Sequence, residues 1–468
     1  MSKLSPARKL SLDVLMEADR RGMYARDVLS SRASAKAIDQ RDSAFAARLA
    51  LGVAATQGIL DELLDQFLDK PKKVAPRVRM ALRISVFEML YLHTPGRVAV
   101  SQGVELVRCG AKSAAGLANA VLHKVADNVE DFATASDVDE SERRLVRLSR
   151  LMGLPRWLCA RIMASFDTPG GALNFAGNLA PAPLALHENA FATKPDPYIS
   201  QLVAPVFPGC HAPVDAQVTV ASGVFERAAA VASDLNAQLI ATAATRPGRC
   251  LEIGAGRGTK TYVMMCQAKR AGYERQHTAL DLHDRKCDLN LARLHKAGIQ
   301  GVRTVSGDAC ELDEVLTSFD AMLGEPVKFD TVFIDAPCSG TGTMRRHPEI
   351  PWRLTENDVT TELPKLQLAM LKEAAVRVAA GGELIYATCS VFDEENTQVV
   401  DAFLASPESA GFTMAPLSGA QILQLPDFEQ AKKLVSVRQN DRGLFQSVPV
   451  NADSYDGHFC ARLVRQSS

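Results

Sequence analysis

The sequence predicts a multidomain protein in which an all-α helix bundle precedes an α/β domain with a parallel, doubly wound sheet. Three observations favour this fold class. The chain has 468 residues, whereas a single hydrophobic core rarely extends beyond about 250–300 residues. Apolar residues in the first 130 positions recur at the 3.6-residue spacing of helices. From residue 249 onward, short apolar runs alternate with helical patterns, as they do in βαβ units.

The N-terminal region, residues 1–130, contains a predicted series of helices with short connections. Ser5 and Pro6 suit the N-cap and first turn of the first helix, and Asp42 is expected to open a later one. Three further helices are predicted over residues 78–92, 98–107 and 116–125. The first of these three is almost uniformly apolar, so we expect it to lie at the centre of the bundle.

The remainder of the chain divides into three predicted parts. Residues 131–143 are acidic and poor in apolar residues, which predicts a linker. We assign residues 144–225 to a small α/β subdomain, and residues 226–468 to the main α/β domain. Strands of this domain are predicted at residues 250–253, 278–282, 302–305, 331–334 and 383–386. Later apolar stretches, from residue 412 onward, predict an antiparallel ending.

Composition restricts the functional classes. No apolar run approaches the roughly 18–20 residues of a membrane span, and no secretory signal is evident, so we expect a cytoplasmic protein. The 10 cysteines show no zinc spacing, which predicts reduced thiols and no metal site. Residues 1–130 carry a net charge of +6 and the remainder −7. This asymmetry is typical of a nucleic-acid-facing module, although a solvated helical surface explains it equally well.

A glycine-rich turn between a predicted strand and helix indicates a nucleotide cofactor. Its glycines allow the backbone to approach a ligand, Asp281 at the next strand end suits a ribose diol, and Asp308 can face the adenine. The glycine pattern alone also fits NAD or FAD. The predicted cofactor-binding residues are Glu252, Gly254, Ala255, Gly256, Arg257, Gly258, Thr259, Lys260, Asp281, Asp308 and Asp335.

Two cysteines at the ends of successive predicted strands carry the chemistry. Cys338 follows Asp335-Ala336-Pro337, and Cys389 follows Thr388. If these strands are neighbours, both thiols open into the cofactor crevice. A thiolate that adds to carbon 6 of a pyrimidine makes carbon 5 nucleophilic enough to accept a methyl group. Asp335 is expected to bond the base edge. The combination favours S-adenosyl-L-methionine over a redox dinucleotide.

These residues resemble the RNA (cytosine-C5) methyltransferase family, specifically its bacterial small-subunit rRNA branch, called RsmB or Sun. The two cysteine motifs carry most of the resemblance. The bundle is similar to the NusB antitermination fold of this branch through residues 82–92 and 116–122. Segments 344–353, 394–396 and 456–459 also match family or branch motifs. The resemblance covers nearly the whole chain. It implies a class I, Rossmann-like, S-adenosylmethionine-dependent methyltransferase domain at residues 226–468 and an RNA-recognition role for the subdomain at residues 144–225.

Roles for the two thiols follow from this resemblance. It implies that Cys389 is the nucleophile and that Cys338 assists product release. Spacing alone leaves this assignment open, because DNA cytosine methyltransferases use the cysteine at the Pro-Cys position. The implied partner is 16S (small-subunit) rRNA, naked or in an early ribosomal intermediate, and we expect a monomer.

The chain departs from the family pattern at two places. The family's Asp-x-Cys-Ala-Ala-Pro-Gly-Gly-Lys is Glu252–Lys260 here, with Arg257 and Thr259 in place of the proline and one glycine. The family's Leu-Arg-x-Asn element is Leu186-His187-Glu188-Asn189. The lost arginine removes a bidentate phosphate or base contact, so substrate choice is predicted to have drifted.

RNA contacts are predicted in a basic loop that also carries an aromatic ring. Its residues are Arg345, Arg346, His347, Trp352 and Arg353. Cations combined with a stacking ring suit single-stranded RNA, and the target base must leave its stack to reach a thiol. Lys70–Lys73 and Arg77–Arg79 are further candidates, or ordinary surface charge. Two alternatives stay open: the same chemistry on tRNA, and a non-catalytic RNA-binding or antitermination protein with a degenerate methyltransferase half.

Overall fold

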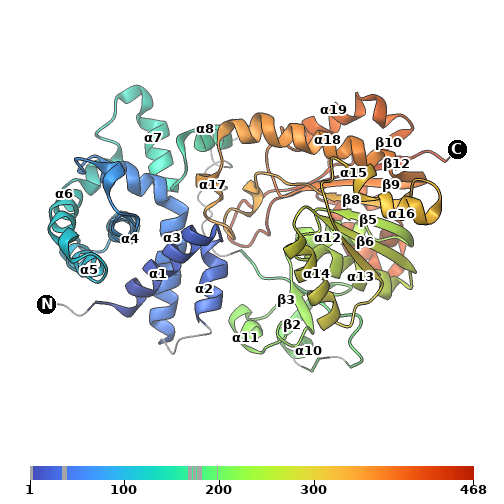
Figure 1. Cartoon of the computed structure of the whole chain (residues 1–468), viewed down its shortest axis with the longest axis horizontal. Coiled ribbons are helices and arrows are strands. Elements are labelled where there is room, and N and C mark those ends of the chain that lie inside the picture. Colours follow the sequence, from blue (N-terminus) through green and yellow to red (C-terminus); the bar gives the residue numbers. More distant parts are fainter. Residues whose placement is uncertain are drawn as a thin grey trace. The chain divides into compact units, whose positions relative to one another are not determined.

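The computed structural model describes residues 4–33, 39–166, 171, 175, 182–194, 196, 197 and 199–467. The chain forms two compact units, and each is described by itself (Figure 1). The first unit contains Met1–Leu179 and an insertion, Met344–Glu356. The second contains Ala180–Thr343 and Asn357–Ser468. The segment after Cys338 therefore leaves the second unit, packs within the first, and returns.

The first unit is helical, as predicted. Its helices are α1 (Pro6–Arg21), α2 (Ala25–Ala33), α3 (Gln40–Asp65), α4 (Pro76–Leu92), α5 (Gly96–Arg108), α6 (Ala115–Thr134), α7 (Glu140–Met152), α8 (Arg156–Ser165) and, from the insertion, α17 (Ile350–Arg353). Ser5 is the N-cap of α1 and Pro6 its first residue. Helix α3 begins two residues before Asp42, because Asp39 is its N-cap and accepts the N–H of Arg41.

Helix α4 forms the centre of the bundle core. It packs against α1, α3, α5 and α6, and almost all of its apolar side chains are buried. Glu88 is also buried there, and its carboxylate is held by the guanidinium of Arg8 on α1 at 2.8 and 2.5 Å. Helix α3 is long and apolar enough to span a membrane by composition alone, but its Leu and Ile side chains belong to this core.

An ion pair attaches the predicted linker, residues 131–143, to the following helix. Helix α6 continues to Thr134, and Asp137 bonds the guanidinium of Arg150 on α7 at 2.5 and 3.0 Å. Arg150 is 3% exposed, also bonds Glu62 of α3, and lies over the Phe132 ring at 3.6 Å. Helices α7 and α8 therefore belong with the bundle, whereas the prediction placed residues from 144 onward in a separate subdomain. Residues 167–170, 172–174, 176–181, 195 and 198 of that subdomain lie outside the described residues.

The second unit begins with a small antiparallel sheet. Its strands are β1 (Leu186–Glu188), β2 (Val203–Phe207), β3 (Cys210–Pro213) and β4 (Ala230–Ala232), in the order β2-β3-β1-β4. Two short helices accompany it, α10 (Ile199–Leu202) and α11 (Ala216–Ala221). This sheet corresponds to part of the predicted RNA-recognition subdomain, but it belongs to the same compact unit as the larger sheet.

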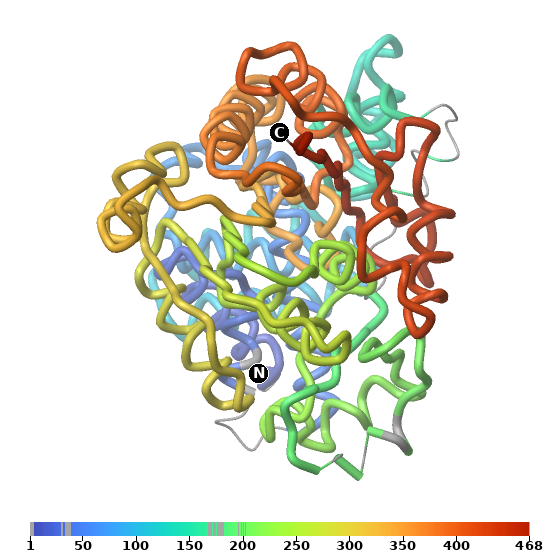
Figure 2. The backbone as a smooth tube through the Cα atoms, turned by 90° about the vertical axis from the view of Figure 1, so that its right-hand side faces the viewer, coloured from blue at the N-terminus to red at the C-terminus, as the bar shows by residue number. Residues whose placement is uncertain are grey.

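The large sheet contains the five predicted strands and the predicted antiparallel ending. Its strands are β5 (Gly248–Ile253), β6 (Arg275–Asp281), β7 (Val302–Ser306), β8 (Phe329–Asp335), β9 (Val378–Thr388), β10 (Phe412–Ala415), β11 (Phe445–Ser447) and β12 (His458–Arg465). The order is β10-β12-β9-β8-β5-β6-β7, with β11 paired to β12. Strands β5 to β9 pair in parallel, and β12 runs antiparallel beside β9. Figure 2 shows this C-terminal strand in red.

Helices cover both faces of the large sheet, as in a doubly wound fold. They are α12 (Leu235–Ala243), α13 (Thr259–Ala271), α14 (Asp284–Lys296), α15 (Leu312–Val315), α16 (Thr317–Leu323), α18 (Leu363–Val376), α19 (Thr397–Leu404) and α20 (Glu429–Ser436). Alternate residues of each strand face opposite cores. Ile334 packs on the side of α18 and α19, and Phe333 on the side of α12, α13 and α20. Two buried faces explain the continuous buried runs of the central strands β5, β8 and β9.

Arg150→Met should destabilise the first unit by about 2 kcal/mol at pH 7, because it removes the buried cation that Asp137 and Glu62 share. The hydrogen bond from Arg150 holds the pKa of Asp137 below its usual value, although burial opposes the shift. A lowered folded-state pKa stabilises the protein above the unfolded pKa of about 3.9, and this stabilisation is lost as pH falls through the folded value. The difference between wild type and variant, measured by urea unfolding, should therefore shrink below about pH 4.

Arg144→Met is the matched control, because Arg144 lies on the same helix with an exposed side chain. It should change the free energy of unfolding by less than about 0.5 kcal/mol. A destabilisation by Arg150→Met that stays constant from pH 7 to pH 3 would contradict the ion-pair explanation.

Candidate active site

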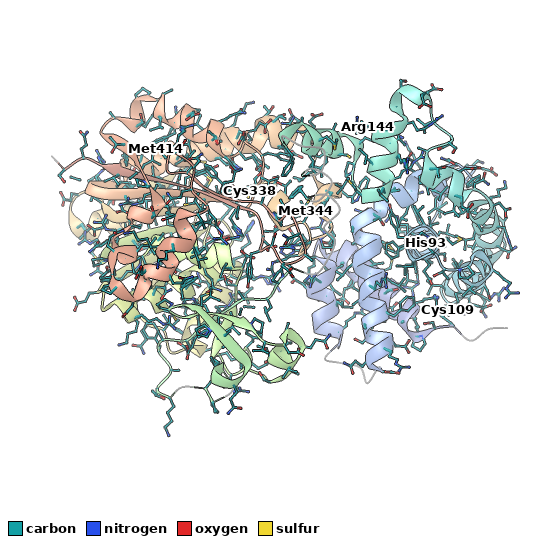
Figure 3. The ribbon with its side chains drawn as sticks, turned by 180° about the vertical axis from the view of Figure 1, so that it is seen from behind. His93, Cys109, Arg144, Cys338, Met344 and Met414 are labelled. Atoms are coloured by element: carbon teal, nitrogen blue, oxygen red, sulfur yellow. The ribbon has the colours of Figure 1, made fainter. Side chains whose placement is uncertain are left out.

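Strand pairing brings the two predicted catalytic cysteines into contact. Strands β8 and β9 are parallel neighbours, with Asp335 opposite Ala387. Cys389 directly follows β9, and Cys338 lies in the loop after β8 (Figure 3). Their sulfur atoms are 3.2 Å apart, and the backbone N–H of Cys389 points to the Cys338 sulfur at 3.3 Å. Both residues are half-buried, and all ten cysteines of the chain are free.

The environment of this pair distinguishes the two thiols. The hydrogen bond to Cys389 raises the pKa of Cys338 well above its usual range, and burial and the charges of Cys389 and Glu395 raise it further. Two thiols at this separation do not readily ionise together. Cys338 therefore retains its proton at neutral pH and can donate a hydrogen bond to the Cys389 sulfur.

Lys260 and Asp335 form an ion pair in the same site. The Lys260 ammonium lies 2.6 Å from Oδ2 of Asp335. Burial alone would lower the pKa of Lys260, but the Asp335 carboxylate outweighs burial and the pKa is raised. The same ammonium also interacts electrostatically with Cys389. A stable positive charge is thus available to a thiolate at Cys389.

The glycine-rich loop has the geometry that a nucleotide cofactor requires. Gly254, Gly256 and Gly258 all have positive φ angles, of 78°, 58° and 78°. A Cβ on Gly254 would lie 2.2 Å from the carbonyl oxygen of Asp335, and one on Gly258 would lie 1.9 Å from Oδ1 of Asn290. Side chains cannot occupy these positions without displacing the loop. The backbone therefore follows the strand end closely even though the family's proline is absent.

The two predicted acidic residues of the cofactor site have different environments. Asp281 is buried at the end of β6, where its carboxylate accepts the N–H of Gly256 at 2.9 Å and of His283 at 3.0 Å. Each carboxylate oxygen keeps a second lone pair, so Asp281 can still accept ribose hydroxyls. Asp308, after β7, is exposed and accepts the N–H of Cys310 at 2.8 Å. These positions fit the ribose and adenine roles predicted for them.

Other residues of the predicted cofactor set support the loop from behind. Glu252 is buried, accepts from Thr261 at 2.6 Å and faces His277 at 2.8 Å, so its side chain joins β5 to α13 and β6. Thr259 accepts from Arg293 at 2.6 Å. Ala255 is buried and its N–H donates to the carbonyl of Leu280, as does that of Gly254. Arg257 is exposed. Direct cofactor contact by these side chains stays a prediction.

Sequence reasoning missed a buried polar cluster directly behind the thiols. It contains Ser339, Ser390, Glu395 and Gln367, and Glu395 accepts hydrogen bonds from the other three. A signal was available, because each cysteine is followed by a serine and a glutamate occurs five residues after the second serine. Nothing in a single sequence, however, shows that this glutamate turns inward.

The five predicted RNA-binding residues lie in the first unit, within the insertion after Cys338. His347 stacks on Tyr24 with ring centroids 4.3 Å apart, and the carbonyl oxygen of Arg346 accepts from Arg26 at 2.9 Å. Arg345 is buried, whereas Arg353 is exposed and lies over Tyr24 at 4.9 Å. The structure thus brings the cysteines, Asp335 and the glycine loop together in one unit and collects the predicted RNA-binding residues in the other.

Trp352 is an anchor of the insertion in the bundle. Its indole N–H donates to the carbonyl oxygens of Ala55 at 2.7 Å and Gly153 at 3.2 Å. The ring lies against Gly58 of α3, where a Cβ would come within 1.9 Å of it. Glu349 adds a second attachment, because its carboxylate accepts the N–H of Ala25 at the start of α2. Contact of the half-buried Trp352 with RNA stays a prediction.

The second departure from the family pattern is a core substitution. His187 is fully buried, with Nδ1 2.8 Å from Gln238 and Nε2 3.0 Å from Arg270. Burial lowers the pKa of His187 well below its usual value, and Arg270 lowers it further, so the ring is neutral. A side chain at this depth does not reach RNA directly.

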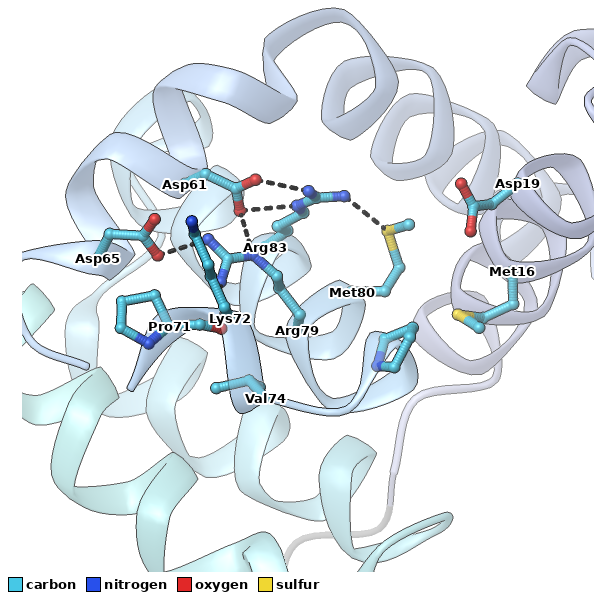
Figure 4. A pocket seen from close by; sticks show the side chains of 11 residues that line it. Met16, Asp19, Asp61, Asp65, Pro71, Lys72, Val74, Arg79, Met80 and Arg83 are labelled. Carbon is cyan, nitrogen blue, oxygen red and sulfur yellow. Dashed lines mark hydrogen bonds and ion pairs between the residues drawn. The ribbon is translucent and has the colours of Figure 1, made fainter. Parts of the chain in front are cut away.

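The first unit also has a hollow of about 430 Å³ beside the α3–α4 connection (Figure 4). Its basic residues are largely neutralised, because Asp61 bonds both Arg79 and Arg83 and Asp65 bonds Arg79. Arg77 pairs with Asp13 nearby. Of the additional RNA candidates, Lys70, Lys72 and Lys73 are exposed. Among the described residues no cluster of His, Cys, Asp and Glu could hold a metal ion.

Comparison with known proteins identifies the family. A protein of Thermus thermophilus named ribosomal RNA small subunit methyltransferase B is 31% identical over 402 residues, which cover 85% of this chain and 87% of that protein. The chain belongs to the ribosomal RNA small subunit methyltransferase B family. Residues 240–463 match the family model described as 16S rRNA methyltransferase RsmB/F, and residues 5–127 match the NusB family.

Another relative agrees with this assignment, and two solved structures share the fold. The protein of Bacillus subtilis named probable ribosomal RNA small subunit methyltransferase B is 26% identical, over 86% of this chain and 89% of that protein. The crystal structure of PH0851 has a TM-score of 0.73 at 19% identity and covers 99% of both chains. The crystal structure of NSun6 from Pyrococcus horikoshii has a TM-score of 0.52 at 15% identity, over 67% of this chain and 99% of that chain. The two structures share the fold.

The methyltransferase B family uses S-adenosyl-L-methionine, and the predicted family, cofactor and fold are confirmed. The close backbone at the three glycines and the acceptor carboxylates of Asp281 and Asp308 fit such a cofactor, and their contact with it stays a prediction.

Gly254→Ala should weaken S-adenosylmethionine binding at least about tenfold, because its Cβ would collide with the backbone of Asp335. Equilibrium dialysis measures this directly. Gly272→Ala is the control for a positive φ angle, since Gly272 ends α13 at φ 68° with open space around it. Equal binding by wild type and Gly254→Ala would show that the loop does not hold the cofactor.

Trp352→Ala should destabilise the first unit by about 3 kcal/mol, because it leaves a cavity beside Gly58 and removes two hydrogen bonds. Trp352→Phe keeps most of the ring and should cost only about 1–2 kcal/mol. Urea unfolding of the full chain gives both values. A change below about 0.5 kcal/mol for the alanine variant would mean that the insertion is not anchored there.

Proposed function

We propose that the protein transfers a methyl group from S-adenosyl-L-methionine to carbon 5 of a cytosine in small-subunit rRNA, through a covalent bond between Cys389 and carbon 6. The observation that carries the proposal is the thiol pair at 3.2 Å, in which Cys338 holds its proton and Lys260 interacts with Cys389. A single reactive thiolate beside a thiol donor and an ammonium suits nucleophilic attack and later release.

Each step can be assigned to bonds and protons. The Cys389 thiolate forms a bond to carbon 6, and the electron pair of the carbon 5–carbon 6 double bond makes carbon 5 nucleophilic. S-adenosylmethionine, when bound, would supply an electrophilic methyl group for carbon 5, and the electron pair of the broken carbon–sulfur bond would stay on the cofactor sulfur as a thioether. A base then takes the carbon 5 proton, the double bond re-forms, and the Cys389 sulfur leaves as a thiolate. The Cys338 thiol stabilises that thiolate by a hydrogen bond.

The Asp335–Lys260 pair supports recognition of cytosine. A carboxylate accepts hydrogen bonds from the N4 amino group of cytosine, and an ammonium can donate to N3 or O2. Uracil has a carbonyl oxygen at position 4. This oxygen and the carboxylate are both acceptors, so no hydrogen bond can form between them. The pair therefore favours cytosine, and its positive end can stabilise the charge that develops when the thiolate adds.

Small-subunit rRNA is the proposed substrate because the relatives that cover most of this chain carry that substrate in their names. The net charge of +6 on residues 1–130 and the exposed Arg353 favour an RNA backbone near the first unit. A reaction on this RNA takes place in the cytoplasm, and we propose that compartment for the protein.

The test incubates the full chain with labelled S-adenosylmethionine and unmodified 16S rRNA. Wild type should label the RNA on cytosine. Cys389→Ala should lower the rate at least about 10³-fold, because no covalent bond to carbon 6 can form. Cys338→Ala should accumulate an RNA–protein adduct on a denaturing gel, because the leaving thiolate loses its hydrogen-bond donor.

Cys109→Ala is the control, since Cys109 is an exposed free cysteine outside this pair and outside the predicted cofactor site. It should retain wild-type activity and form no adduct. Labelling of tRNA instead of 16S rRNA would keep the chemistry and reject the substrate. If wild type labels neither RNA, the enzymatic proposal fails and a non-catalytic RNA-binding role replaces it.

A further inference from the structure

We propose that Glu395 is a positioning residue of the methyl-transfer reaction, because its buried carboxylate ties the loop that carries Cys338 to the loop that carries Cys389. This inference rests on the proposed function of the two thiols. Glu395 touches neither sulfur through a hydrogen bond. It acts on the residues that directly follow each cysteine, and so on the distance between the sulfur atoms.

The carboxylate bonds both loops at once. Oε1 accepts the backbone N–H of Ser339 at 2.7 Å, and Oε2 accepts the hydroxyl of Ser390 at 2.5 Å. Gln367 of α18 donates to Oε1 at 3.1 Å and to the carbonyl oxygen of Pro337 at 2.9 Å. The residues on both sides of Cys338 are therefore held: Ser339 bonds Glu395 directly, and Pro337 bonds Gln367, which itself bonds Glu395.

The glutamate itself is held rigidly. Its backbone carbonyl accepts the hydroxyl of Tyr386 at 2.6 Å, and the next residue, Asn396, bonds Thr388 and the carbonyl oxygen of Ser390. Glu395 and Asn396 are fully buried. An acceptor with this support can transmit a fixed spacing to the loops that it joins.

Hydroxyl groups extend the connection between the loops. The Ser339 and Ser390 hydroxyls lie 3.1 Å apart, and Thr341 is within 3.3 Å of both and accepts the N–H of Val391. The hydrogen bonds that reach Ser390 and Val391 join the segment that carries Cys338 to the segment that carries Cys389. A purely space-filling role would not need a polar acceptor here, because a buried polar group is costly unless it is hydrogen-bonded.

The test separates side-chain reach from charge. Glu395→Asp keeps the charge but withdraws the carboxylate by about 1.5 Å, the length of one carbon–carbon bond. Glu395→Gln keeps the reach and can still accept from Ser339 and contact the Ser390 hydroxyl. Asp393→Asn is the control, because Asp393 is exposed two residues away.

Phenylarsine oxide is the probe, because one arsenic atom bonds two thiols and releases water without any change in redox state. Wild type, Glu395→Gln and Asp393→Asn should each bind it through Cys338 and Cys389, and Cys338→Ala should not. Glu395→Asp should bind at least about tenfold more weakly, since the loops lose their common acceptor. Equal binding by Glu395→Asp and wild type would overturn the proposal.

Steady-state kinetics supply a second measurement. A loss confined to kcat is expected from misplaced thiols and not from a general loss of folded protein structure. Glu395→Asp should lower kcat about 10–100-fold with the KM for RNA unchanged, and Glu395→Gln should restore kcat to within about threefold of wild type. An increase in KM with normal kcat would contradict positioning. If Glu395→Asp does not fold, Ser390→Ala takes its place, and unchanged arsenic binding and kcat in that variant would overturn the proposal.

The two readouts also distinguish this proposal from the function on which it rests. Normal arsenic bridging in a wild-type protein that methylates no RNA would reject the proposed reaction. Loss of bridging in Glu395→Asp alone would still support the role of Glu395 in spacing the thiols.

Discussion

The parallel pairing of β8 with β9 is the constraint on which the rest of the site depends. It sets Asp335 opposite Ala387, so the segments that leave the two strands start side by side and place two sulfur atoms 3.2 Å apart. At that distance the thiols share one environment and cannot behave as independent acids. The hydrogen bond to Cys389 and burial raise the pKa of Cys338, and the Lys260 ammonium interacts electrostatically with Cys389.

Three features of the second unit hold this pair of thiols in place. The glycine loop lies against the backbone of Asp335, Lys260 at the start of α13 bonds the Asp335 carboxylate, and the polar layer behind the thiols ties their loops together. The insertion after Cys338 adds a different constraint, because it packs with the helices of the first unit through Trp352 and Glu349. A family motif with the composition of an RNA-binding loop thus also has a structural role.

Much of the fold was predictable because local patterns and tertiary structure agree. The five parallel strands, the central position of α4 and the strand-end positions of the two cysteines all followed from period, apolar runs and strand-end residues. Domain boundaries were less predictable. The acidic composition of residues 131–143 predicts a linker, but Asp137 is held by Arg150 from the next helix, and a single sequence does not reveal that pairing.

The sequence by itself determined which reactive groups the site contains, namely the thiols, carboxylates and glycines. It also determined that these groups follow strand ends, because that position depends only on spacing along the chain. Only the tertiary structure decided which groups meet. Glu395 turns inward to join two loops, Trp352 is used as an anchor, and His187 is buried in the core, because each depends on contacts between residues distant in sequence. Such contacts follow from packing and burial of the whole chain, and local residue patterns carry little information about them.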